Sequence, residues 1–208
     1  MSADRSVLPG ELRSDLKLIA DMIAPNSRVL DIGCGDGALL GFLTAEKSVD
    51  GRGMEISQSG VNACVSHGLS VIQGDADTDL NDYPSDTFDY VVLSQTLQAT
   101  RNPKGVLQDL VRIARLAVVS FVNFGHWRIR WKLFAEGRMP ATAGSNHSWY
   151  DSPDIHLCTI RDFIELCGEA GLAIERGISI DRRGHAFRTI GRLANWRDEQ
   201  AVFLLRRS

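Results

Sequence analysis

Three glycines follow a short apolar run near the start of the chain. Residues 29–37 read Val-Leu-Asp-Ile-Gly-Cys-Gly-Asp-Gly, and Glu55 ends a second short run. A glycine-rich turn after a strand lets a ligand approach the backbone closely. In doubly wound sheets, nucleotides bind beyond the carboxyl ends of the strands. A carboxylate at position 55 can accept hydrogen bonds from both hydroxyls of a ribose, so the pattern predicts a site for a nucleotide-like ligand.

Asp31 distinguishes between two classes of such ligands. Gly33, Gly35 and Ala38 satisfy the dinucleotide pattern G-x-G-x-x-G/A. A dinucleotide loop accepts an anionic pyrophosphate, however, and a carboxylate two positions before the first glycine is unfavourable there. S-adenosylmethionine carries no phosphate but a sulfonium and an ammonium, both positive. Asp31 therefore favours S-adenosylmethionine, or its product S-adenosylhomocysteine, as the ligand.

The chain resembles the class I methyltransferases at four places. Residues 31–37 resemble their motif I, Glu55 their ribose-binding acid, residues 74–76 (Gly-Asp-Ala) the adenine-facing segment, and residues 88–94 their fourth strand. The resemblance covers about residues 28–122. The cofactor-binding residues that it implies are Asp31, Gly33, Cys34, Gly35, Gly37, Glu55, Ile56, Gly74, Asp75, Ala76, Ser94 and Gln95. Alternatives remain: Asp31 as a capping or solvated carboxylate, Glu55 as a structural acid, and Asp75 as ordinary turn chemistry.

The sequence assigns no catalytic residue. Many small-molecule methyltransferases of this class have Leu-Glu-His just after the fourth strand, where a positioned base can take a proton. This chain has Leu97, Gln98 and Ala99 there, and none of them titrates. No His, Asp or Glu spacing suggests a metal, and no two cysteines form a CxxC pair.

The remaining pattern predicts strands that alternate with helices, typical of an α/β fold. We expect strands at 28–32, 53–56, 69–73, 88–94, 116–121, 172–180 and 200–206. Helices are expected from about residue 12 to 23, from 38 to 45, from Ser57 to His67, from Pro103, and from Thr159 to about Ala170. This predicts a Rossmann-like class I methyltransferase fold with a mostly parallel seven-stranded sheet, helices on both faces and an antiparallel edge strand.

Length, net charge and cysteine content limit the classes of protein to which the chain can belong. The chain has 208 residues, a net charge of −3 and four cysteines. We expect one domain over 1–208, with a cofactor-binding half at about 28–122, a lid or partner insertion at about 123–157 and a closing part at 158–208. An acidic chain argues against a nucleic-acid binder or a membrane-surface protein. The sparse cysteines, and the lack of a long apolar run, predict a cytoplasmic protein.

Residues 123–157 contain an aromatic and basic segment. Trp127, Trp131 and Phe134 share one face of an expected helix. Arg128, Arg130 and their neighbours give residues 126–138 a local charge of +3. Three readings stay open: a helix packed on the domain, a protein–protein surface rich in hot-spot residue types, and a nucleic-acid stacking site. His147, Trp149, Tyr150, Asp151 and His156 are candidates for the mouth of the pocket.

Several stretches together resemble the MetW methionine-biosynthesis proteins. They are residues 30–40, 94–99 (Ser-Gln-Thr-Leu-Gln-Ala), 121–127 (Phe-Val-Asn-Phe-Gly-His-Trp), 137–140 (Gly-Arg-Met-Pro), 149–162 and 199–205. The resemblance covers nearly the whole chain. It implies a methyltransferase-like protein that works with a homoserine O-acyltransferase, with Trp127, Arg128, Arg130, Trp131 and Phe134 as candidate contact residues.

Two functions follow as hypotheses. In the first, the protein binds S-adenosylmethionine or S-adenosylhomocysteine, associates with homoserine O-acyltransferase and activates it. In the second, it is a methyltransferase for a small carboxylate or thiol metabolite. Such acceptors lose their proton near neutral pH without a strong base, so the absent Leu-Glu-His does not exclude the second hypothesis.

Overall fold

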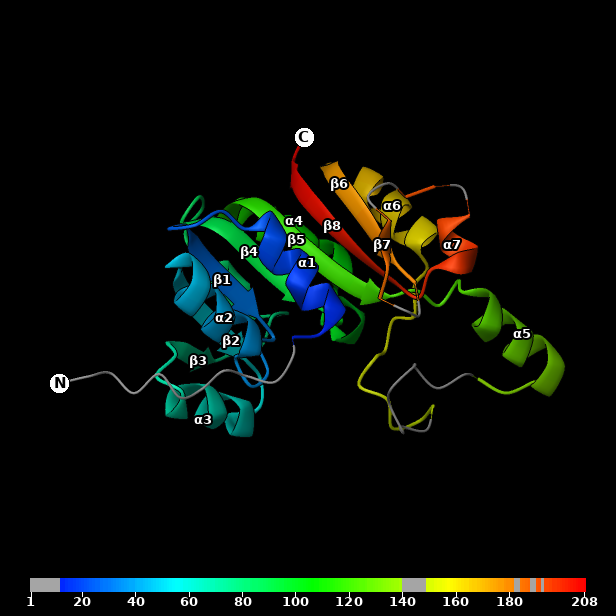
Figure 1. Cartoon of the computed structure of the whole chain (residues 1–208), viewed down its shortest axis with the longest axis horizontal. Helices are drawn as coiled ribbons and strands as arrows, with labels where there is room; N and C mark the ends of the chain where they lie inside the picture. Colours follow the sequence, from blue (N-terminus) through cyan, green and yellow to red (C-terminus); the bar gives the residue numbers. More distant parts are fainter. Residues whose placement is uncertain (1–11, 140–148, 182–183, 188–189, 192) are drawn as a thin grey trace.

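A mixed eight-stranded sheet forms the centre of the computed structural model, which describes residues 12–139, 149–181, 184–187, 190–191 and 193–208. The strand order is β3-β2-β1-β4-β5-β8-β6-β7 (Figure 1). The strands are β1 (Arg28–Ile32), β2 (Asp50–Glu55), β3 (Val71–Gln73), β4 (Phe88–Ser94), β5 (Ala114–Val122), β6 (Leu172–Ile180), β7 (Ala186–Phe187) and β8 (Gln200–Arg207).

The first five strands run parallel to one another, and β8 runs antiparallel to both β5 and β6. The predicted mostly parallel α/β sheet with an antiparallel edge is confirmed. The seven expected strands are all present, and the structure adds β7, a two-residue strand paired antiparallel with β6. Two residues with no hydrophobic alternation give too little pattern to be found from sequence.

The helices cover both faces of the sheet (Figure 1). They are α1 (Ser14–Met22), α2 (Ala38–Lys47), α3 (Gln58–Ser66), α4 (Pro103–Ile113), α5 (Trp127–Glu136), α6 (Ile160–Glu169) and α7 (Ala194–Arg197), with 3-10 turns η1 (Asp79–Asp82) and η2 (Leu97–Ala99). Buried side chains of α1 and α2 pack on one face of the sheet, and those of α4 and α6 pack on the other.

The alternation of side chains along β1 decides which helix each residue meets. Val29 packs in the cluster that contains α1 and α2, whereas Leu30 and Ile32 pack in the cluster that contains α4 and α6. Because side chains alternate between the faces of a strand, Asp31 shares the face of Val29. The acidic residue before the glycines is therefore directed toward α1.

Local signals set the ends of the helices as predicted. Ser57 Oγ accepts a hydrogen bond from Gly60 N at 3.1 Å at the start of α3. At the start of α6, Thr159 Oγ1 accepts from Asp162 N at 3.3 Å, and Asp162 Oδ2 accepts from Thr159 N at 2.9 Å. This reciprocal pair is a capping box, and it satisfies two backbone amides that the helix itself leaves without partners.

We expect Thr159→Ala to lower the free energy of unfolding by about 1 kcal/mol, because one capped amide loses its acceptor. Urea denaturation measures the change. Thr159→Ser keeps the hydroxyl and serves as the control, with stability close to that of the unaltered chain. Equal losses in the two variants would contradict the role of the hydroxyl.

Candidate functional site

The loop after β1 has a backbone that requires glycine. Gly33, Gly35 and Gly37 have φ values of 69°, 58° and 81°, in the left-handed region. A Cβ on Gly33 would collide with the Thr96 side chain, and a Cβ on Gly37 would collide with Leu69. A Cβ on Gly35 would meet no described atom within 4 Å. The loop is thus packed against protein at both ends and open at its middle glycine, where a ligand can approach the backbone.

Asp31 lies at the bottom of a small cavity beside this loop. The cavity has a volume of about 110 Å³ and is lined by Arg13, Leu16, Asp31, Gly33, Cys34, Gly35, Asp36, Ala38, Leu39 and Ser94. Asp31 is 2% exposed, and no donor in the described part of the chain forms a hydrogen bond with its Oδ1. An unpartnered buried carboxylate oxygen is costly, so this atom is a candidate ligand contact.

The charge state of Asp31 depends on its surroundings. Burial raises the pKa of Asp31 to about 7, against the opposing effect of the Arg13 guanidinium, and the negative charge of Glu55 adds to the rise. A cation placed next to Oδ1 would favour the ionised form. The site is therefore suited to a small positively charged group.

Glu55 holds the glycine loop from the end of β2. Its Oε2 accepts a hydrogen bond from Gly35 N at 3.0 Å, and its Oε1 accepts one from Ser57 N at 2.9 Å. A carboxylate has about four acceptor positions, so both oxygens can accept further bonds from a ligand. Ile56, next in the chain, is 63% exposed and offers an apolar surface beside Glu55.

The segment after β3 lies at the same edge of the sheet but does not line the cavity of Asp31. Gly74 N donates to Glu55 O at 3.1 Å, which ties this segment to β2. Asp75 Oδ1 accepts a hydrogen bond from Asp77 N at 2.9 Å. Asp75 thus takes part in the hydrogen bonding of a local turn, which is the alternative role that the sequence left open for it. Ala76 packs against the core on the α4 side.

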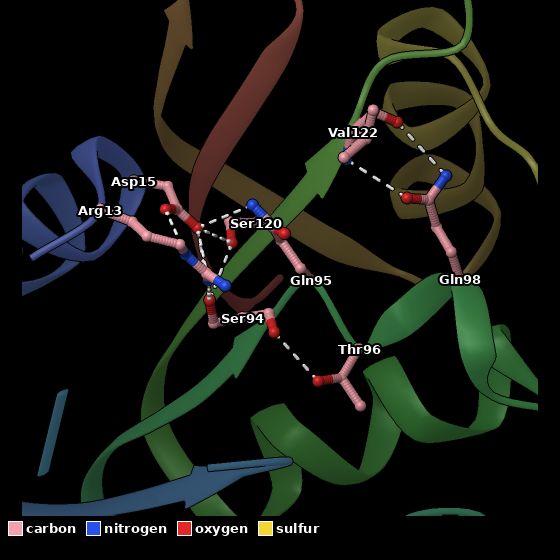
Figure 2. A network of polar contacts seen from close by, with 8 residues as sticks. All are labelled: Arg13, Asp15, Ser94, Gln95, Thr96, Gln98, Ser120 and Val122. Carbon is pink, nitrogen blue, oxygen red and sulfur yellow. Dashed lines mark hydrogen bonds and ion pairs between the residues drawn. The ribbon is translucent and has the colours of Figure 1, made fainter. Parts of the chain in front are cut away.

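A network of polar side chains surrounds Asp15 (Figure 2), and two of its residues, Arg13 and Ser94, also line the cavity of Asp31. Asp15 of α1 is 1% exposed and accepts hydrogen bonds from Arg13 Nε and Nη2, each at 3.1 Å. Gln95 Nε2 donates to Asp15 Oδ2 at 3.1 Å, and the hydroxyls of Ser94 and Ser120 lie 3.4 Å from the same oxygen. The network joins α1 to the carboxyl ends of β4 and β5.

Sequence reasoning named Ser94 and Gln95 but missed Arg13, Asp15 and Ser120. Ser94 lines the cavity, whereas the Gln95 side chain is directed to Asp15. Arg13 and Asp15 are brought to this place by the packing of α1 across the sheet, and an acid within an amphipathic helix gives no signal of that. Ser120 is placed by the pairing of β5 with β4, in which it lies opposite Ser94. The one local hint is that Asp15 falls on the apolar face of α1, near Leu16 and Ile19.

Gln98 stands where the Leu-Glu-His pattern has its glutamate, and in this structure its side chain makes structural hydrogen bonds. Its Oε1 accepts a hydrogen bond from Val122 N, and its Nε2 donates to Val122 O, both at 3.2 Å (Figure 2). Its backbone oxygen accepts bonds from Ile155 N and His156 N. Gln98 therefore fastens η2 to the end of β5 and to the segment 155–156.

Helix α5 extends from the end of β5, away from the sheet (Figure 1). None of its ten residues is buried. Trp131 is 63% exposed and Phe134 is 83% exposed, so the reading in which the aromatic stripe packs on the domain is wrong for these two residues. Trp127 differs, because its ring lies 6.0 Å from that of Trp196.

The other aromatic and histidine candidates do not gather at the cavity of Asp31. Trp149 and Tyr150 are 76% and 75% exposed and contact each other edge to face. His156 lines a different cavity, described below. His147 lies outside the described residues.

Within the described ranges, no three His, Cys, Asp or Glu side chains gather in a way that could hold a metal ion. No helix in the part of the chain that the structure describes has the length and apolar character needed to cross a membrane.

We expect Asp15→Ala to lower the free energy of unfolding by about 2–3 kcal/mol, because the buried donors around Asp15 lose their common acceptor. Urea denaturation measures the loss. Asp21→Ala removes an exposed acid from the same helix and is the matched control, with an expected change within about 0.5 kcal/mol. A loss no larger than that of the control would contradict a structural role for the network.

Comparison with known proteins gives a family and a fold. Residues 13–205 match the family described as "Methionine biosynthesis protein MetW". The chain is 32% identical over 179 residues to the "Bifunctional methionine biosynthesis protein MetXA/MetW" of Rhodopirellula baltica. That match covers 82% of this chain and 29% of the relative, so the chain spans less than a third of the relative's length.

Solved structures agree on the fold at low sequence identity. A SAM-dependent methyltransferase of Thermotoga maritima, described as a possible histamine N-methyltransferase, has a TM-score of 0.69 at 15% identity, covering 94% of this chain and 88% of that one. The [4+2]-cyclase SpnF has a TM-score of 0.66 at 18% identity, covering 92% and 80%. A TehB-like SAM-dependent methyltransferase of Corynebacterium glutamicum has a TM-score of 0.62 at 16% identity, covering 95% and 89%.

The solved neighbours share a fold that carries more than one chemistry, since one of them is a cyclase. A fold by itself does not decide function. The family match, in contrast, extends over almost the whole chain, from α1 to β8. The chain therefore belongs to the MetW family of methionine biosynthesis proteins and has the Rossmann-like fold of the class I methyltransferases.

Proposed function

We propose that this protein binds S-adenosylmethionine or S-adenosylhomocysteine at the glycine loop and acts as a regulatory partner of homoserine O-acyltransferase. One observation carries the cofactor assignment: Asp31 is buried beside the loop with an oxygen that no described donor satisfies. Both ligands carry an ammonium group on their amino-acid part. That ammonium would supply the missing donor and the positive charge that ionised Asp31 needs.

Arg13 supports the same ligand. Its guanidinium lines the cavity, and its side chain is 55% exposed. Its Nε and Nη2 donate to Asp15, and Nη2 also donates to Ser94 Oγ at 3.1 Å, which leaves the two N–H groups of Nη1 for a second anion. The amino-acid part of the ligand carries a carboxylate as well as an ammonium. Arg13 and Asp31 thus form a pair of opposite charges that matches a zwitterion.

Glu55 and Ile56 extend the site along the end of β2. We propose that Glu55 accepts hydrogen bonds from the ribose hydroxyls and that exposed Ile56 contacts the adenine ring. Asp75 is the proposed contact for the adenine amino group. Its carboxylate accepts one hydrogen bond from Asp77 N and has further acceptor positions for the amino group. Gly33 and Gly37 act through the loop conformation, and Cys34 lines the cavity.

The affinity for S-adenosylhomocysteine should rise with pH. Asp31 has a pKa of about 7 in the free protein, and the ammonium of the ligand needs its ionised form. Between about pH 5.5 and about pH 7 the ionised fraction, and with it the association constant, should rise about fifteenfold. Isothermal titration calorimetry measures this dependence.

Methylthioadenosine is the matched control ligand, because it keeps the nucleoside but lacks the amino-acid part. Its affinity should change little over the same pH range. Asp31→Asn should weaken S-adenosylhomocysteine binding and remove most of its pH dependence. A pH dependence shared equally by both ligands would contradict the role of Asp31.

The partner assignment draws on the architecture of the relative in Rhodopirellula baltica. That protein is described as bifunctional, with MetXA and MetW in one chain. Two activities joined in one chain favour physical association of their counterparts when these are separate proteins. This supports a complex of the present chain with a MetX-type homoserine O-acyltransferase.

Helix α5 is the proposed contact surface. Arg130 Nε donates to Gly125 O and Trp127 packs near Trp196, so these two side chains hold the base of the helix. Trp131 and Phe134 lie 6.0 Å apart, ring to ring, and are largely exposed. Arg128 lies over the Trp127 ring at 5.4 Å. Exposed tryptophan, phenylalanine and arginine on one projecting helix are typical of an interface with a protein.

Phe134→Ala and Trp131→Ala should each weaken binding to the acyltransferase by about thirtyfold if they occupy the centre of the interface. Ile164→Ala removes an exposed apolar residue from α6 and is the matched control. Surface plasmon resonance with immobilised acyltransferase measures the dissociation constants. Equal affinities of all three variants for the acyltransferase would contradict a binding surface on α5.

Regulation would follow from linkage between the two sites. S-adenosylmethionine is made from methionine, so its binding can report the output of the pathway. If the ligand changes the affinity for the acyltransferase, the acyltransferase must change the affinity for the ligand by the same factor. Acyltransferase activity measured with and without this protein, across a ligand titration, separates activation from sensing.

The alternative function is methyl transfer to a small carboxylate or thiol. One observation supports methyl transfer: the polar network around Asp15 lies at the carboxyl ends of β4 and β5, directly beside the cavity of Asp31. Both oxygens of Asp15 already accept hydrogen bonds. In methyl transfer, Asp15 would therefore help to orient the substrate that receives the methyl group rather than remove a proton from it. Transfer of a labelled methyl group to a metabolite extract would favour this alternative.

A further inference from the structure

A second cavity lies on the other side of the β4–η2 segment. Its volume is about 350 Å³, within the range of small-molecule sites. It is enclosed by η2, the start of α4, the segment 156–158 and α6. Its lining residues and those of the Asp31 cavity, all within the described chain, do not overlap. The proposed cofactor site therefore does not account for it.

The inner part of this cavity is apolar. Leu97 and Phe163 are 2% and 1% exposed and belong to the main core. Pro103 and Leu166 complete the apolar lining. Cys158 also borders the cavity, but burial raises the pKa of its thiol to about 12, and Gln98 Nε2 lies 3.7 Å from the sulfur. A neutral thiol is a weak nucleophile, so the lining is suited to binding rather than to covalent chemistry.

The rim of the cavity carries an excess of positive charge. Arg101 and Lys104 line it, together with one acid, Asp162. Asp162 Oδ2 accepts the hydrogen bond of the α6 capping box, so its charge is directed to the backbone of its own helix. Lys104 lies 3.6 Å from Glu169, and Arg101 lies 3.9 Å from Asp75. Ion pairs this long and this exposed contribute little, so a ligand can compete for both cations.

We propose that this cavity binds a small amphipathic carboxylate, with its apolar chain against Leu97, Phe163 and Leu166 and its carboxylate between Arg101 and Lys104. The apolar interior excludes a fully polar ligand, because the interior offers few partners for buried polar groups. The two cations at the rim disfavour an amine. Size, apolar lining and charge thus converge on a monoanion with a short apolar chain.

The segment from Ser94 to Gln98 connects this cavity with the glycine loop. Thr96 Oγ1 donates to Ser94 O at 3.0 Å (Figure 2). The Thr96 side chain also packs against Gly33. The next two residues, Leu97 and Gln98, line the second cavity. A ligand that holds these residues in place should also hold Thr96 against the glycine loop. Ordering of one site by the ligand of the other gives positive coupling.

Octanoate is a suitable probe, with octylamine as the control of opposite charge. Calorimetry on the whole chain should detect octanoate and little or no octylamine. Arg101→Gln and Lys104→Gln, both at exposed positions, should each weaken octanoate binding by roughly tenfold. Arg115→Gln removes an exposed cation elsewhere and should leave the affinity unchanged.

Leu166→Trp should abolish octanoate binding by filling the cavity, and Ile164→Trp is its matched control on α6, outside the lining. Circular dichroism checks that the variants fold. If Leu166→Trp does not fold, the two charge variants still decide the proposal. Absence of octanoate binding, equal binding of octylamine, or full affinity in both charge variants would overturn it.

The coupling between the cavities rests on the proposed cofactor function and has a separate measurement. Saturating octanoate should tighten S-adenosylhomocysteine binding by about fivefold. An unchanged affinity would overturn the coupling. Because octanoate binding is measured without S-adenosylhomocysteine, failure of the cofactor assignment is distinguishable from failure of the second site.

Discussion

The site is organised by one buried carboxylate, Asp31, whose Oδ1 accepts no hydrogen bond from any described residue. Asp31 stands on a central strand, on the face that α1 covers, with 2% of its surface exposed. Burial of an ionised group is expensive, and the pKa of about 7 reflects that cost. Arg13, the glycine loop and the polar ends of β2 and β4 surround this one group. A cationic ligand next to Asp31 would offset the free-energy cost of burying its negative charge.

Helix α1 makes this arrangement possible. Its apolar residues pack on the sheet in the same cluster as Val29 and Val118. Its acidic residue Asp15 turns inward to the hydroxyls of Ser94 and Ser120. The helix thereby brings Arg13 over the cavity without burying the guanidinium. A helix that precedes the first strand thus completes a site at the ends of strands far along the chain.

None of the residues that line the two cavities belongs to α5, which carries the exposed aromatic side chains. The two cavities share the β4–η2 segment, and Gln98 ties that segment to the end of β5. Helix α5 follows β5 directly and presents Trp131 and Phe134 to solvent. Movement at the end of β5 can therefore reach α5 along the chain, and the β4–η2 segment through the hydrogen bonds between Gln98 and Val122. This gives a physical route by which a ligand could influence a partner.

The sequence by itself determined the sheet, the glycine loop and most helix ends. Hydrophobic alternation, the glycine spacing and the capping residues Ser57, Thr159 and Asp162 act over a few neighbouring positions, so they can be read locally. The tertiary structure alone decided the partners of Asp31, the network of Asp15 and the cavity beside α6. Several of those contacts join residues that are 60 or more positions apart, such as Asp15 with Ser94 and Gln98 with Cys158. Local pattern says which face a residue takes, but only the packing of helices on the sheet decides what it meets there.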